Sequence, residues 1–129
     1  MTLLPVEEIR VTVPDRQDWP TGEDDWRCCN PNCGQRGTEG HHVVRRTATS
    51  GPVDWVAVDG IVLQNVVRVC HTCHEDITQH RAWIRHLPGE GWVWYAALPR
   101  GLAASPGADR VQHPKSGREF VRIGPVRGV

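Results

Sequence analysis

Apolar residues cluster along the chain in short runs whose pattern predicts β-strands. β-branched residues dominate positions 53–58 and 61–69, and the Asp59-Gly60 dipeptide between these runs is a strong signal for a tight hairpin turn. Further strands are predicted at 8–13, 41–46, 92–98 and, as a last edge strand, 120–129. The pattern thus predicts several short extended segments.

One helix is predicted directly after the second β-branched run. Thr72 and Glu75 have the spacing of a capping box, in which each side chain bonds to a free backbone N–H group of the first turn. The residues that recur at helical spacing on one face are His74, Ile77, Arg81 and Ile84. We therefore predict a helix that begins near Thr72 and ends before Pro88 and Gly89.

The composition indicates a small core that needs an additional staple. The chain has 129 residues, of which 39% are hydrophobic and 6% aromatic, and ten prolines and thirteen glycines interrupt regular elements. A core of this size rarely stabilises a fold alone. By composition, the chain divides into an acidic leader at 1–26, a central domain at 27–98 and a Pro/Gly-rich tail at 99–129.

Charge is distributed unevenly although the formal net charge is zero. Residues 1–26 carry seven acidic side chains and two arginines, whereas residues 27–129 carry thirteen basic and eight acidic side chains. Fourteen of the fifteen basic residues are arginine, whose planar guanidinium suits phosphate recognition. The sequence shows neither an apolar run long enough to span a membrane nor a signal peptide, so we expect a cytoplasmic protein without a membrane partner.

The cysteines have the spacing of a metal site. Cys70 and Cys73 form a Cys-x2-Cys pair, and either Cys28 or Cys29 forms a second pair with Cys33. Two such pairs can surround a structural Zn²⁺ ion with four thiolates, and the spacing favours Cys28 as the fourth ligand. Two alternatives remain open, namely reduced thiols without a metal and a thioredoxin-like redox pair at the later Cys-x2-Cys.

Histidines and an asparagine accompany these thiols in a fixed order. The adjacent pair His41-His42 precedes Asn65, and His74 follows directly after the Cys-x2-Cys pair. Together, these segments resemble the HNH nuclease family, many members of which carry a four-cysteine zinc knuckle. The resemblance covers residues 28 to about 85.

The resemblance implies an α+β fold, with a ββα-metal core stapled by the four-cysteine zinc site and flanked by short strands and irregular termini. Residues 27–98 would then be the nuclease domain with its zinc knuckle. His41 and His74 would bind one catalytic divalent ion, which could be Mg²⁺, Mn²⁺, Ni²⁺ or Zn²⁺. His42 would act as the general base. Asn65 would fix the loop and the orientation of that base.

The implied function is hydrolysis of DNA phosphodiester bonds by a metal-dependent endonuclease, either nicking or cutting both strands. Arg45 and Arg46 follow the histidine pair and are candidates for phosphate contacts. A bacterial or phage-infected cell would be the setting, and a phage or bacterial protein partner is left open. The histidines without an assigned role are His71, His80, His86 and His113.

An alternative function is a non-catalytic zinc module that binds DNA or a protein partner. In that case the metal-stapled finger would be kept for structure, and the catalytic ion would be lost. A purely structural module does not need His41, His42, Asn65 and His74 together, so the sequence favours the enzyme.

Overall fold

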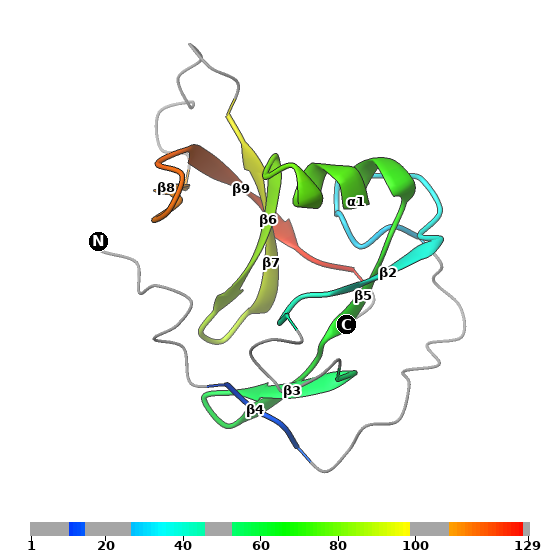
Figure 1. Cartoon of the computed structure of the whole chain (residues 1–129), viewed down its shortest axis with the longest axis vertical. Coiled ribbons are helices and arrows are strands. Elements are labelled where there is room, and N and C mark those ends of the chain that lie inside the picture. The colour runs from blue at the N-terminus through cyan, green and yellow to red at the C-terminus, as the bar shows by residue number, and fades with distance from the viewer. Residues whose placement is uncertain (1–10, 15–26, 46–52, 99–108, 128–129) are drawn as a thin grey trace.

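The computed structural model describes residues 11–14, 27–45, 53–98 and 109–127, and the account below applies to them. The elements in chain order are β1 (Val11–Thr12), β2 (Glu39–His42), β3 (Trp55–Val58), β4 (Ile61–Gln64), β5 (Val66–Val69), α1 (His71–Thr78), β6 (Ala82–Leu87), β7 (Gly91–Ala97), β8 (Arg110–Gln112) and β9 (Glu119–Pro125). They form three antiparallel sheets, with strand orders β1-β3-β4, β2-β5 and β6-β7-β9-β8 (Figure 1).

The predicted hairpin is confirmed. β3 and β4 pair from Val58 and Ile61 outward, and the connecting residues Asp59 and Gly60 have φ angles of 51° and 82°. Positive φ at both turn positions matches the right-handed twist of the flanking strands, which is why Asp-Gly favours this turn. The second β-branched run does not form one strand, however, because Asn65 interrupts it between β4 and β5.

The predicted long helix is wrong in its second half. Helix α1 is eight residues long, and the chain reverses after it through His80, whose φ is 60°. The segment that follows is strand β6, in which Ala82 and Ile84 are buried while Trp83 and Arg85 are half-buried. This alternation of buried and half-buried side chains is typical of a strand, although the spacing of the apolar residues also fits a helix. The strand forms because every residue of β6 pairs with β7.

The helix also begins differently from the prediction. Its N-cap is Cys70, whose sulfur accepts a hydrogen bond from the Cys73 backbone N–H over 3.3 Å, so a capping box from Thr72 to Glu75 is not used. Cys70 therefore determines both where its own sulfur lies and where the helix begins.

The C-terminal region completes the largest sheet. β9 lies between β7 and β8, so it is an interior strand and not the predicted edge strand. β8, within the predicted Pro/Gly-rich tail, pairs with β9 through Arg110 and Val121. Residues 110–125 of the predicted tail therefore contribute two strands, because their alternating apolar side chains find a partner in β7 that local sequence does not reveal.

The predicted α+β class with a ββα-metal core is wrong. Of the described residues, 49% lie in strands and 9% in the single short helix, so the protein is mostly β. The shortened helix and the strands after it account for the difference. The main core gathers valines from β3 and β5, tryptophans from β7 and four of the cysteines, and a smaller cluster surrounds Tyr95 and Phe120. No helix among the described residues has the length and hydrophobicity needed to span a membrane.

Gly37, two residues before β2, lies very close to Arg68 of β5 and to the backbone of Arg27. A Cβ atom at Gly37 would lie 2.9 Å from the Arg68 Cβ and 3.0 Å from the Arg27 carbonyl oxygen, closer than van der Waals contact allows. Glycine is therefore needed for the chain to pass β5 at this point.

We expect Gly37→Ala to lower the free energy of unfolding by about 1–3 kcal/mol, because the added methyl group forces the backbone apart. Gly34→Ala is the matched control, since a Cβ atom at Gly34 meets nothing within 4 Å. Urea unfolding of the two variants beside the wild type, with zinc added to all three, measures the difference, and equal midpoints for all three would contradict the steric argument.

Candidate metal centre and adjoining histidines

Four thiols from two distant segments meet at one point. The sulfur atoms of Cys28, Cys33, Cys70 and Cys73 all lie within 4.8 Å of one another. The Cys33 and Cys70 sulfurs are 3.8 Å apart. Four sulfurs placed tetrahedrally around one ion, with bonds of about 2.3 Å, would be separated by roughly 3.8 Å. The cluster therefore has the size of a four-thiolate metal site, and the donor set fits a thiophilic ion.

Local structure holds each half of this cluster. In the first half, the Cys33 N–H donates to the Asn30 carbonyl over 2.9 Å and closes a tight turn. The Asn30 side chain crosses to the second half and donates to the Cys73 sulfur over 3.5 Å. In the second half, Cys70 caps α1 and Cys73 lies in its first turn. A helix start and a turn thus present two sulfurs each.

Cys29 lies outside this group, so the sulfur that clusters with those of Cys33, Cys70 and Cys73 is that of Cys28. Its side chain is 1% exposed and belongs to the hydrophobic core. Burial raises the pKa of the Cys29 thiol far above its ordinary value, so this thiol stays protonated. Its backbone joins two elements, since its N–H donates to Arg68 and its carbonyl accepts from Arg127.

Arg127, two residues after the end of β9, braces the first half of the cluster. The Arg127 guanidinium donates to the carbonyl oxygens of Cys33 over 2.9 Å and of Pro31 over 2.6 Å. These carbonyls belong to the turn that carries the thiols, so the side chain ties that turn to the end of the four-stranded sheet.

His41 and His74 are brought together by strand pairing and by the helix start. β2 pairs with β5 with His41 opposite Val67, and α1 follows β5 directly. The ring centroids of His41 and His74 lie 5.3 Å apart in an edge-to-face arrangement. The two residues predicted as ligands of the catalytic ion are therefore neighbours, although 33 positions separate them in the sequence.

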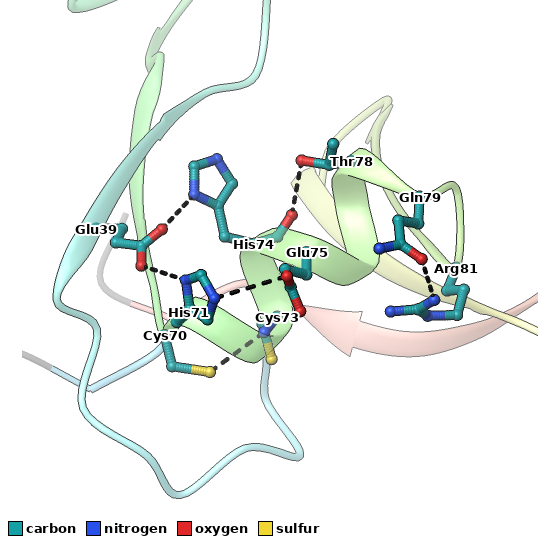
Figure 2. A network of polar contacts seen from close by, with 9 residues as sticks. All are labelled: Glu39, Cys70, His71, Cys73, His74, Glu75, Thr78, Gln79 and Arg81. Carbon is teal, nitrogen blue, oxygen red and sulfur yellow. Dashed lines mark hydrogen bonds and ion pairs between the residues drawn. The ribbon is translucent and has the colours of Figure 1, made fainter.

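Glu39 connects two histidines of α1 to β2. Its carboxylate lies 2.6 Å from His74 Nδ1 through one oxygen and 3.0 Å from His71 Nδ1 through the other (Figure 2). His71 also faces Glu75 at 3.6 Å. The hydrogen bonds from His74 and then His71 lower the pKa of Glu39, so it is a carboxylate at neutral pH.

The environment of His41 keeps its imidazole neutral. Burial is the largest cause that lowers the pKa of His41 to about 4, and electrostatic interactions with His74, His42 and Arg45 lower it further. A neutral imidazole has a lone pair available for a metal ion, whereas an imidazolium has none. The His41 ring is thus ready to act as a ligand at physiological pH.

His42 ends β2 and lies on a different side of the strand from His41. Adjacent strand residues point to opposite faces, and the His42 Nε2 atom lies 3.8 Å from the Asp54 carboxylate, in the segment before β3. Its side chain is 37% exposed, which leaves it open to water. His42 nevertheless stays within electrostatic range of His41, whose pKa it lowers.

Asn65 ties the segments around His42 together. Its side chain is fully buried, accepts a hydrogen bond from the Val44 N–H over 2.7 Å, and donates to the carbonyls of Val44 and Val53 over 3.2 and 2.9 Å. Its backbone accepts from the Val43 N–H and donates to the Asp54 carbonyl. Asn65 therefore fixes the chain directly after His42 against the chain that carries the facing carboxylate.

Of the two arginines predicted to contact phosphates, the structure describes Arg45. Arg45 is exposed, and its charge reaches His41. Arg46 lies outside the described residues.

Sequence reasoning did not single out Glu39 or Asp54. Glu39 stands two positions before His41, and a spacing of two places both side chains on one face of a strand, so the β-pattern held a usable signal. Asp54 carried no such signal, because its proximity to His42 arises from the packing around Asn65.

Comparison of the chain with protein-family models, curated proteins and solved structures gives no significant match. The functional argument therefore rests on the residues and their geometry.

We expect Cys70→Ala to lose the bound metal ion and to lower the melting temperature, because three sulfurs close the site poorly and the helix loses its N-cap. Cys29→Ala is the control and should keep the metal stoichiometry of the wild type, even if the smaller side chain weakens the core. Metal content by elemental mass spectrometry and thermal melting measure both effects. Equal loss of metal in the two variants would contradict the assignment of the fourth ligand.

The surroundings of His41 predict an unusual titration. In protein without added divalent ions, the C2 proton signal of His41 should have its NMR titration midpoint near pH 4, and that of His71 above pH 6.5, because Glu39 raises the pKa of His71. Between pH 6.5 and 4, His41 binds a proton in the unfolded chain but not in the folded protein. The free energy of unfolding therefore falls as the pH drops from 6.5 toward 4. A His41 midpoint of 6.5 or higher would contradict this expectation.

Proposed function

We propose that this chain is a metal-dependent endonuclease that hydrolyses DNA phosphodiester bonds, as its likeness to HNH nucleases implies. The observation that carries the proposal is the distance of 5.3 Å between the ring centroids of His41 and His74. Two imidazoles from separate elements, one of them kept neutral by burial, make a metal site with positions left for substrate. A purely structural module would not require this convergence.

The four-cysteine cluster holds a structural Zn²⁺ ion in this proposal. Thiolates favour zinc over harder ions, and four of them leave no open position for chemistry. Because Cys70 and Cys73 lie at the start of α1, the bound ion fixes the helix that carries His74. The zinc ion would therefore contribute to folding and to the position of the reactive site, without taking part in the reaction.

His41 and His74 hold the catalytic divalent ion in this proposal. Imidazole ligands favour Mn²⁺, Ni²⁺ or Zn²⁺ over Mg²⁺. The ion, when bound, would stabilise the negative charge that develops on the phosphate and on the leaving 3′ oxygen.

His42 acts as the general base in the proposed reaction. Its partly exposed ring accepts a proton from a water molecule, and the water oxygen attacks the phosphorus as the bond to the 3′ oxygen breaks. The nearby Asp54 carboxylate stabilises the imidazolium that results. Asn65 keeps the backbone after His42 in place, so it is a positioning residue. The leaving 3′ oxygen takes a proton from solvent water, so the products would carry 5′-phosphate and 3′-hydroxyl ends.

Arg45 supports a nucleic-acid substrate in this proposal. An exposed guanidinium three residues after the proposed base is placed to bind a phosphate next to the scissile bond. Binding through such contacts weakens as salt concentration rises, because bound counterions are released from the nucleic acid.

We expect His42→Ala to reduce plasmid cleavage by about 100-fold or more, because the water loses its general base. The assay uses supercoiled plasmid with Mg²⁺, Mn²⁺ or Ni²⁺ and an EDTA control, and the metal content of the variant should match that of the wild type.

His80→Asn is the matched control for the loss of an imidazole. His80 is exposed, and asparagine tolerates its positive φ. Cleavage by the control should equal that of the wild type. Full activity of His42→Ala would refute the assignment of the base, and a wild type that binds DNA without cutting it would favour the non-catalytic zinc module.

A further inference from the structure

The carboxylate of Glu39 makes its shortest contact with one particular nitrogen of His74. The Oε1 atom lies 2.6 Å from His74 Nδ1, whereas the contact of Oε2 with His71 is longer at 3.0 Å. Side chains of Glu39 and His74 are each about one-third exposed, so water does not fully replace this contact. Figure 2 shows the second ring nitrogen of His74 on the side of the ring away from Glu39.

This contact determines where the proton of His74 resides. An ionised carboxylate can only accept hydrogen bonds, so the Nδ1 atom of His74 must carry a proton and donate it. A neutral ring then has its lone pair on Nε2 alone. Without such an acceptor, a histidine side chain favours the opposite form, with the proton on Nε2 and no lone pair there.

Strand geometry places Glu39 for this task. Glu39 and His41 lie two residues apart on β2 and therefore point to the same face of the strand, the face on which α1 packs. The same strand thus supplies one imidazole and the carboxylate that orients the other. Metal-binding histidines commonly donate their second ring N–H to a carboxylate, which fixes the ring and makes the free nitrogen a better donor.

We infer that Glu39 is a positioning residue for the divalent-ion site, where it holds His74 as the Nδ1–H form and so presents Nε2 to the ion. The inference rests on the proposed function in one respect, the presence of an ion at His41 and His74. The fixed proton position of His74 is a property of the protein itself and is measurable without any ion.

Nitrogen-15 NMR of the histidine side chains tests the proton position first. His74 of the wild type should show the Nδ1–H form, and Glu39→Ala should shift it toward the Nε2–H form. Glu39→Gln should keep most of the Nδ1–H form, because the amide oxygen can still accept the hydrogen bond. Glu75→Ala is the matched control, since it removes a carboxylate that faces His71 and not His74. An unchanged His74 form in Glu39→Ala would overturn the inference.

Calorimetric titration with Ni²⁺ tests the consequence for the ion. The protein is loaded with zinc at the cysteines beforehand, and its zinc content is measured again afterwards. Glu39→Ala should bind Ni²⁺ about 10–100-fold more weakly than the wild type, with Glu39→Gln in between and Glu75→Ala unchanged. His74→Ala identifies the binding event, because it should abolish it.

The possible failures are distinguishable. A wild type that binds no Ni²⁺ at His74 would refute the proposed ion site, and with it the proposed function, whatever the NMR result. A wild type that binds Ni²⁺ as tightly as Glu39→Ala would refute the role of Glu39 alone and leave the ion site intact.

Discussion

The convergence of four thiols is the constraint on which the other features of the site depend. Cys28 and Cys33 belong to a turn, and Cys70 and Cys73 to the start of a helix, yet their sulfurs meet within 4.8 Å. Four thiols at this distance, three of them buried, are poorly stabilised as thiolates without a cation between them, because like charges repel at short range. Once an ion joins them, the turn cannot move away from the helix, and the strand that follows the turn is held as well.

This constraint sets the arrangement of the histidines. β2 leaves the cysteine turn and pairs with β5, which leads into α1. His41 on β2 and His74 on α1 are therefore connected through the same cluster from both sides. Glu39 adds a polar contact between strand and helix. Arg127 adds a second contact, because its side chain binds carbonyls of the cysteine turn and links that turn to the end of the largest sheet.

Local sequence was sufficient where one interaction dominates. Asp59-Gly60 adopts its turn because the two residues tolerate positive φ without help from the rest of the chain. The spacing of the cysteines predicted the cluster because thiol convergence depends on short loops. Within the predicted order of histidines and asparagine, His41 and His74 do come to lie side by side.

The helix prediction was wrong over residues 82–87, where both a helical and a strand pattern fit the same residues. Ala82 and Ile84 lie on one face of a strand, and the second of these also fits the face of a helix continued from His74. Hydrogen bonding to β7 decides in favour of the strand. β7 follows a separate turn, so the pattern of residues 82–87 alone does not reveal this partner. The consequence is a mostly β protein in which one short helix serves chiefly to present two thiols and an imidazole.

The sequence by itself determined the turn at Asp59-Gly60, the spacing of the cysteines that is typical of metal sites, and which histidines are candidate ligands. Each of these depends on a few neighbouring residues. Only the tertiary structure decided that Cys29 is buried in the core while Cys28 joins the cluster, that Asn65 bridges three segments, and that Glu39 faces His74. These outcomes follow from strand register and packing between residues far apart in the chain. A shift of register by one residue would turn the same side chains to the opposite face.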